Sequence, residues 1–191
     1  MKTLIINGSP RKDGDSMTLV NEMRKFLEGE VKIVNTYYDN ISGCIDCRYC
    51  WEKPGCAIND GMQDIYKFIE NADNIILSSP IYFSELTGSL LNFASRLQTL
   101  YVAKHKRKDS KFNLKKKNGV LVISAGGDSM NLESRTLETA NIVFNHMNTK
   151  SIGTVDTLQT DHISAKENIN ALNKANEFAL ELNKLHIASD I

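Results

Sequence analysis

The stretch Asn7-Gly8-Ser9-Pro10-Arg11-Lys12-Asp13-Gly14-Asp15-Ser16-Met17-Thr18 is a polar loop between two apolar segments. The segment before it, residues 3–6, is too short for a helix and is typical of a buried strand. Apolar residues recur at helical spacing after it, at Leu19, Met23, Phe26 and Leu27. The loop is therefore predicted to join a strand to a helix.

Such a loop favours an anion, because the first N–H groups of a helix lack partners within the helix and the helix dipole is positive there. Ser9, Ser16 and Thr18 would add hydroxyl donors, and Arg11 would add positive charge. The alternative is an ordinary strand-to-helix turn with a serine cap.

The glycine spacing excludes two other phosphate motifs. Gly8 and Gly14 are six residues apart, and Asp15 stands where a nucleoside-triphosphate loop needs lysine. The dinucleotide pattern G-x-G-x-x-G is also absent. The loop suits a single terminal phosphomonoester, as in flavin mononucleotide (FMN).

Strand-like and helix-like segments alternate along the rest of the chain. The predicted strands are residues 3–6, 31–34, 74–78, 120–123 and 151–155. Helical spacing begins at Leu19, Met62, Leu90, Leu137 and Ile169. This alternation predicts an α/β fold with a doubly wound, five-stranded parallel sheet of order 2-1-3-4-5 and helices on both faces, as in flavodoxin-like proteins. Ligands in that architecture bind at the carboxyl ends of strands 1 and 3, where the opening loop lies.

Length and charge limit the class of protein. The 191 residues suit one domain, residues 1–191, and the 23 basic and 23 acidic residues give no field to attract nucleic acid or an anionic membrane. No apolar run approaches the ~20 residues of a membrane span, and no signal peptide is evident. We expect a cytoplasmic protein, in which cysteines are thiols, metal ligands or redox groups.

Two connections are longer than usual, at about residues 37–59 and 101–118. The second carries a basic run: Lys104, Lys106, Arg107, Lys108, Lys111, Lys115, Lys116 and Lys117. It is interpreted either as a solvated surface or as a docking patch for an anionic reductant such as NADPH. Both interpretations predict that it is exposed.

Two more loops lie on the predicted ligand edge, at residues 79–88 and 124–128. A flavin ring needs an apolar wall and close backbone N–H groups, which Tyr82 with Phe83 and Gly126 with Gly127 would supply. Singly, Pro80 could rigidify a turn and the glycines could end a strand. Three loops on one edge favour the binding interpretation.

These residues resemble the NADPH-dependent FMN reductase and iron–sulfur flavoprotein group of the flavodoxin-like superfamily, over nearly the whole chain. The matching segments are residues 8–11, 14–18, 44–62, 79–82, 87–88 and 124–127, with Arg96. The resemblance implies bound FMN. It implies a phosphate site of Ser9, Arg11, Ser16, Met17 and Thr18, and a ring site of Pro80, Tyr82, Phe83, Ser84 and the backbone of Ala125, Gly126 and Gly127. Leu91 replaces a frequent lysine, and Ser95-Arg96 replaces Asp-Arg, which puts an intersubunit ion pair in doubt.

All four cysteines lie within thirteen residues in the pattern C-x₂-C-x₂-C-x₅-C: Cys44, Cys47, Cys50 and Cys56. A zinc ribbon would separate two C-x₂-C pairs by roughly 15–20 residues, whereas compact spacing is typical of a [4Fe–4S] site. In the family that this chain resembles, iron–sulfur flavoproteins hold a cluster on such a motif, but similar segments also occur without one. Two interpretations stay open, namely a cluster or thiols in a loop that shapes the flavin pocket. Trp51 either covers that pocket or anchors the loop.

The predicted activity is FMN-dependent electron transfer from NAD(P)H or a protein donor to a quinone, flavin, ferric complex or nitro compound. The flavin carries this chemistry, so no catalytic side chain is predicted. The alternative is an electron carrier or redox sensor with a cluster. A phosphate-binding domain of response-regulator type is disfavoured, because it needs acidic residues where Asn7-Gly8 and Ser78-Ser79 stand.

Self-association is also expected. An apolar stripe wider than one sheet-facing surface predicts a homodimer or homotetramer: Leu86, Leu90, Leu91, Phe93, Ala94, Leu97, Leu100 and Tyr101. The resemblance implies the same, since relatives complete the flavin site with a neighbouring subunit.

Overall fold

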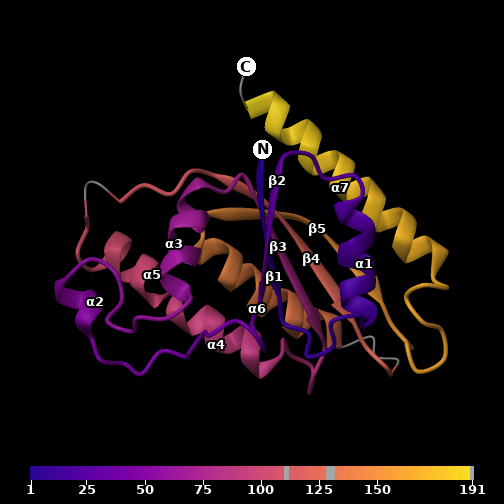
Figure 1. Cartoon of the computed structure of the whole chain (residues 1–191), viewed down its shortest axis with the longest axis horizontal. Coiled ribbons are helices and arrows are strands. Elements are labelled where there is room, and N and C mark those ends of the chain that lie inside the picture. The colour runs from indigo at the N-terminus through magenta and orange to yellow at the C-terminus, as the bar shows by residue number, and fades with distance from the viewer. Residues whose placement is uncertain (110–111, 128–131, 190–191) are drawn as a thin grey trace.

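The computed structural model describes residues 1–109, 112–127 and 132–189. Its centre is a parallel sheet of five strands in the order β2-β1-β3-β4-β5 (Figure 1). The strands are β1 (Lys2–Asn7), β2 (Glu30–Asn35), β3 (Asn74–Pro80), β4 (Lys117–Ser124) and β5 (Thr149–Thr157). The predicted fold class, strand order and parallel pairing are confirmed.

Helices cover both faces of the sheet (Figure 1). They are α1 (Asp15–Arg24), α2 (Tyr49–Glu52), α3 (Met62–Asn71), α4 (Gly88–Arg96), α5 (Gln98–His105), α6 (Leu132–His146) and α7 (Ile169–Ser189). Helices α1 and α7 pack on one face, and α3 to α6 pack on the other. In the described part of the chain, no helix combines the length and apolarity that crossing a membrane requires.

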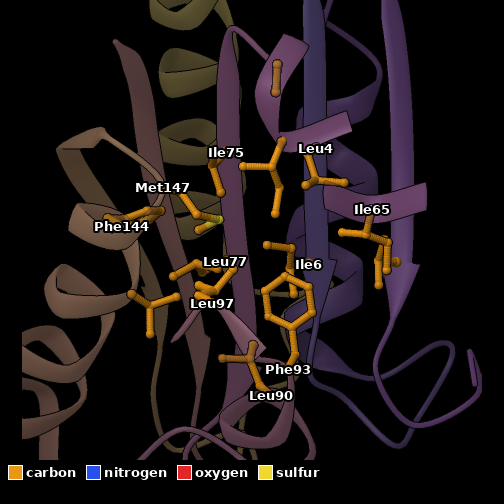
Figure 2. Close-up of a cluster of buried hydrophobic side chains, with 14 of the residues drawn as sticks. Leu4, Ile6, Ile65, Ile75, Leu77, Leu90, Phe93, Leu97, Phe144 and Met147 are labelled. Atoms are coloured by element: carbon orange, nitrogen blue, oxygen red, sulfur yellow. The ribbon is translucent and has the colours of Figure 1, made fainter. Parts of the chain in front are cut away.

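The side chains of the central strands alternate between two cores, as expected for a sheet that is buried on both faces. Leu4, Ile6, Ile75 and Leu77 point toward α3 to α6 and meet residues such as Phe93 (Figure 2). The intervening strand residues face the second core: Ile5, Ile76, Val120 and Val122 pack with α1 and α7. This packing holds the carboxyl ends of β1, β3 and β4 side by side.

Two residues of the predicted first helix, Phe26 and Leu27, lie beyond its end. Helix α1 ends at Arg24, with Lys25 as its C-cap. Phe26 therefore follows the helix, and it is 39% exposed instead of lying on the buried face.

Most side chains of the apolar stripe are buried within the chain itself. Five of its members are buried in the core beside α3 to α6: Leu86, Leu90, Phe93, Leu97 and Leu100. Leu91 and Ala94 are half-buried, and Tyr101 is 44% exposed. The stripe is covered because α5 follows α4 directly and both helices pack against the sheet. It therefore requires no second subunit, and self-association stays a prediction.

The two long connections contain helices of their own. Helix α2 lies within the first, and the last five residues of α5, residues 101–105, lie within the second. The predicted exposure is wrong for Lys117, which is only 2% exposed because it is the first residue of β4. Its Nζ donates to the carbonyls of Lys115, at 2.9 Å, and Met147, at 3.0 Å. Lys111 of the basic run lies outside the described residues.

Candidate functional site

Residues 8–14 connect β1 to α1 at the carboxyl edge of the sheet (Figure 1). Gly14 is the N-cap of α1, and no side chain caps this helix terminus. The first N–H groups of α1 are therefore open to an anion. Ser78, near the end of the neighbouring β3, is fully buried, and its hydroxyl has no hydrogen-bond partner in the described structure. The uncapped terminus and the unpaired hydroxyl fit an anionic group such as a phosphate.

Ser9 shapes this loop from within. It is 2% exposed, and its Oγ accepts the N–H of Arg11, at 3.2 Å, and donates to the carbonyl of Arg11, at 3.0 Å. Asn7 Oδ1 accepts the N–H of Ser9 at 3.0 Å. The Ser9 hydroxyl proton is thus engaged inside the loop in this conformation. The loop therefore presents the backbone of the turn to an anion, more than it presents the Ser9 hydroxyl.

The remaining predicted phosphate residues surround the start of α1. Ser16 and Met17 are buried in the first turn, while Thr18 is half-buried. The side chain of Arg11 is 68% exposed, and its Nη2 lies 3.5 Å from Asp15 Oδ2. Arg11 therefore stands at the rim of the loop, where it can turn toward an anion by leaving a weak, solvent-screened pair.

The opening loop also packs on the N-terminus of α4, a contact that sequence reasoning missed. Thr87 caps α4, and its Oγ1 donates to the carbonyl of Gly8 at 2.7 Å. A Cβ at Gly8 would lie 2.8 Å from Leu90 Cβ and from Thr87 Oγ1. Glycine is required here for close approach. The available signal was the threonine that precedes the helical pattern, which is a typical N-cap.

The loop after β3 forms a tight hairpin that projects from the sheet edge. Tyr82 and Glu85 exchange two backbone hydrogen bonds, of 2.9 and 3.0 Å. Both residues between them have positive φ, 52° at Phe83 and 64° at Ser84, a conformation that Asn-Gly normally occupies. Phe83 is fully exposed and Tyr82 is 45% exposed. A strained turn thus holds aromatic side chains in solvent beside the half-buried Pro80, as an apolar wall for a planar ligand would require.

The loop after β4 is paired with the loop after β5. Ala125 donates its N–H to the carbonyl of Thr157 at 3.0 Å, so this N–H is not free for a ligand. The N–H of Gln159 donates to the carbonyl of Gly127 at 3.2 Å, and a Cβ at Gly126 would lie 2.6 Å from Asp161 Oδ2. Residues 159–161 therefore belong to this edge, although no motif marks them. Asp128, which the sequence placed in this loop, lies outside the described residues.

The structure brings the three predicted loops to one edge, because β1, β3 and β4 are adjacent strands. Contact between their residues and FMN stays a prediction. The basic triplet at residues 115–117 is at the opposite end of β4, on the order of 26 Å away along eight residues of strand. An open hollow of about 1310 Å³ also lies at that amino-terminal edge, between Lys117, Lys150 and His186. Parallel sheets bind ligands at the carboxyl edge, so neither feature belongs to the candidate site.

The four cysteines line one small pocket together with Trp51, Arg96 and Thr99. No cysteine is in a disulfide; Cys44 and Cys47 are exposed, and Cys50 and Cys56 are half-buried. Burial raises the pKa of the Cys50 thiol, and nearby negative charge at Cys44 and Cys56 raises it further. The thiols are thus close enough to interact.

The donor set fits an iron–sulfur cluster, but the loop is not a preformed cage. Within the described residues, no group of three or more His, Cys, Asp or Glu side chains is placed to hold a metal ion. The pocket has a volume of about 20 Å³, room for about one water. Loading a cluster would therefore require the exposed part of the loop to open and the thiols to lose protons.

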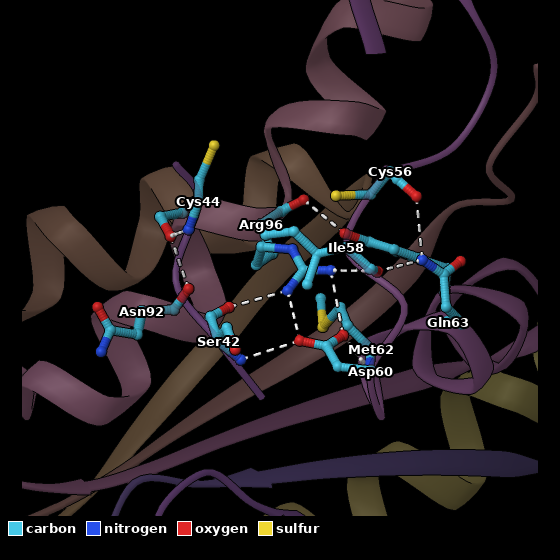
Figure 3. Close-up of polar contacts among 11 residues, drawn as sticks. Ser42, Cys44, Cys56, Ile58, Asp60, Met62, Gln63, Asn92 and Arg96 are labelled. Atoms are coloured by element: carbon cyan, nitrogen blue, oxygen red, sulfur yellow. Dashed lines mark hydrogen bonds and ion pairs between the residues drawn. The ribbon is translucent and has the colours of Figure 1, made fainter. Parts of the chain in front are cut away.

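A buried ion pair fixes both ends of the cysteine loop (Figure 3). Arg96 forms two hydrogen bonds with the carboxylate of Asp60, at 2.7 and 3.1 Å, and donates to the carbonyls of Ser42, at 2.9 Å, and Ile58, at 3.3 Å. Burial acts against the charge of both partners. The hydrogen bonds between them outweigh it, so the pKa of Asp60 is lowered and the pKa of Arg96 is raised. The segments that carry the family resemblance include Asp60 and Arg96, but the resemblance does not imply that the two residues pair.

The middle of the loop is held by α5 and the residues that follow it. Thr99 Oγ1 donates to the carbonyl of Gly55 at 2.9 Å, and Arg107 Nη1 donates to the carbonyl of Cys50. Two cations lie over the Trp51 ring, with Lys106 Nζ 3.7 Å and Arg48 Cζ 4.8 Å from its centroid. Trp51 therefore fastens the loop to the body of the protein through cation–π contacts.

Comparisons with known proteins identify the family to which this architecture belongs. The family model for NADPH-dependent FMN reductases matches residues 1–160. The chain belongs to this family. An iron–sulfur flavoprotein of Methanosarcina thermophila is 28% identical over 142 residues, which cover 73% of this chain and 70% of that protein. One of Methanocaldococcus jannaschii is 34% identical over 105 residues, which cover 53% of this chain and 54% of that protein. The match spans about half the length of this relative and of two others.

Solved structures show the same fold at low identity. The NAD(P)H:quinone oxidoreductase from Methanothermobacter marburgensis superposes with a TM-score of 0.72 at 15% identity, covering 96% of this chain and 97% of that one. An FMN-dependent NADH-azoreductase from Bacillus anthracis, solved in complex with FMN, gives 0.66 at 16% identity, covering 95% and 99%. These similarities establish the flavodoxin-like fold of the family for this chain.

Proposed function

We propose that this member of the FMN reductase family is an FMN-dependent oxidoreductase. It would take electrons from NAD(P)H or a protein donor and pass them to a small acceptor, such as a quinone, a flavin, a ferric complex or a nitro compound. The observation that carries the proposal is the uncapped N-terminus of α1, which lies on the same sheet edge as two further loops suited to a flavin ring. A quinone oxidoreductase and an azoreductase share the fold.

The residues of this chain would bind and orient the cofactor. FMN, when bound, supplies the chemistry of hydride and electron transfer at its ring. The backbone of residues 8–17 and the hydroxyls of Ser16 and Thr18 would hold its phosphate. Tyr82 and Phe83 would cover the ring, and the N–H groups of Gly126 and Gly127, which donate to none of the described residues, would reach its polar edge.

Flavin selectivity tests this proposal. We expect FMN to bind at least about tenfold more tightly than riboflavin, because only FMN carries the phosphate; tenfold corresponds to about 1.4 kcal/mol. Combining Arg11→Ala with Ser16→Ala should weaken FMN binding and leave riboflavin binding unchanged, as measured by flavin fluorescence titration. Arg24→Ala, at the other end of α1, is the matched control. Equal affinity for the two flavins would remove the phosphate argument.

The second candidate function is an electron carrier or redox sensor with a [4Fe–4S] cluster. It is favoured by the four cysteines that line one pocket and by the names of the relatives, which are iron–sulfur flavoproteins. Four free thiols also suit a cytoplasmic location. Anaerobic reconstitution should then yield about four iron and four sulfide per chain. Failure to take up iron, with all four thiols still titratable, would contradict the cluster, and steady-state NAD(P)H oxidation with a quinone separates an enzyme from a carrier.

A further inference from the structure

Arg96 carries one donor that the fold does not use. Its side chain is fully buried, and both terminal nitrogens are engaged by Asp60, Ser42 and Ile58. Its Nε is buried without a hydrogen-bond partner in the described structure. An unpaired buried N–H is costly, and that of a charged group more so. The guanidinium is planar, so this N–H cannot turn to share the acceptors of the other nitrogens.

Arg96 lies beside the cysteines. Arg96 lines the same pocket as Cys44, Cys47, Cys50 and Cys56. Figure 3 shows Asp60 on one side of the guanidinium and Cys44 and Cys56 on the other.

The ion pair with Asp60 reduces the net charge that Arg96 presents to this pocket. The bidentate pair leaves almost no net charge, since each carboxylate oxygen accepts from one terminal nitrogen. The donor that the guanidinium still has to offer is therefore its unpaired Nε–H. A thiolate or an inorganic sulfide is the acceptor that such a donor lacks.

We propose that Arg96 is a positioning residue for an iron–sulfur cluster on the four cysteines, and that its Nε–H donates a hydrogen bond to a cluster sulfur. This inference rests on the second candidate function. A hydrogen bond to sulfur stabilises the more negative, reduced cluster, so Arg96 raises the reduction potential. Asp60 acts against this by its charge while it fixes the guanidinium in place.

The test is the midpoint potential of the reconstituted full-length protein, followed by EPR in a dye-mediated titration. Arg96→Lys keeps the charge but cannot place a donor at Nε, and we expect the equilibrium constant for cluster reduction to fall about tenfold, which is 59 mV for one electron. Arg48→Lys is the matched control, since Arg48 lines the same pocket but is 63% exposed; its potential should not change. Asp60→Asn removes a negative charge and should raise the potential. A purely structural role, in which both Arg96→Lys and Asp60→Asn loosen the loop, predicts shifts of the same sign.

A second measurement uses the unaltered chain, so this test of the proposal does not depend on whether Arg96→Lys folds. Protein labelled with ¹⁵N-arginine should show a ¹⁵N coupling in pulsed EPR of the reduced cluster, and this coupling should persist in Arg48→Lys. Absence of the coupling, or an unchanged potential in Arg96→Lys, overturns the inference and leaves the cluster standing. Wild-type protein that takes up no iron overturns the cluster and this inference together, while flavin selectivity tests the oxidoreductase independently.

Discussion

Lys117 is buried although the lysines beside it predict an exposed position, because it is the first residue of β4. It ends a run of three lysines, a pattern typical of solvent exposure, yet it is 2% exposed at the start of β4. Burial, followed by the positive charge of Lys115, lowers the pKa of Lys117 to about 8. The carbonyls of Lys115 and Met147 accept from its Nζ and keep it inside the fold.

This lowered pKa makes stability depend on pH. Between about 8, in the folded chain, and 10.5, in the unfolded chain, the unfolded state binds more protons at Lys117, so stability must rise with pH. Below this window both states are protonated, and the burial penalty is fully present. We expect urea unfolding to show wild type gaining up to about 1.4 kcal/mol per pH unit relative to Lys117→Met between pH 8 and about 10. Lys116→Met, at an exposed position, should follow wild type, and parallel profiles for wild type and Lys117→Met would refute a buried lysine of lowered pKa.

At the scale of elements, α4 joins the two candidate sites. Thr87 at its N-terminus binds the carbonyl of Gly8 in the opening loop, and Arg96 at its C-terminus binds Ser42, Ile58 and Asp60 around the cysteine loop. The helix has nine residues, so these contacts are separated by about 13.5 Å. One rigid element thus fixes the opening loop relative to the loop that carries the four cysteines.

Features that depend on residues close together in the chain could be predicted from the sequence, whereas contacts between residues far apart in the chain could not. Strands β1 to β5 and the opening loop are encoded locally, by apolar runs and their spacing, and they were located correctly. The break between α4 and α5 could not be seen, because Leu97 keeps helical dihedral angles as the C-cap of one helix and the N-cap of the next, and no glycine or proline marks the junction. The contact between Thr87 and Gly8 joins residues 79 positions apart, and that between Arg96 and Asp60 joins residues 36 apart. Such pairs depend on how elements pack, which no local pattern specifies.

At the scale of the whole molecule, several exposed aromatic side chains lie at the carboxyl edge of the sheet. The leucine-rich stripe is buried by the chain itself, whereas four aromatic side chains at the sheet edge are between 42% and fully exposed: Tyr37, Tyr38, Tyr82 and Phe83. Scattered exposed aromatics are ordinary on a monomer. A fully exposed phenylalanine in a left-handed conformation is different, because it costs on the order of 1 kcal/mol while no side chain in the described part of the chain covers it.

We therefore expect a homodimer or homotetramer in which Phe83 packs against a neighbouring chain near the flavin edge. Light scattering at micromolar concentration should give two or four times the chain mass of 21.4 kDa. Phe83→Asn suits the positive φ and should preserve or slightly raise the stability of each chain, yet it should weaken association by about tenfold or more. Phe26→Asn, on an exposed aromatic away from this edge, should leave association unchanged. A wild-type mass of 21.4 kDa would exclude the oligomer. An unchanged oligomer with weakened FMN binding in Phe83→Asn would instead assign this side chain to the flavin ring of its own chain, since the strained hairpin then serves the cofactor alone.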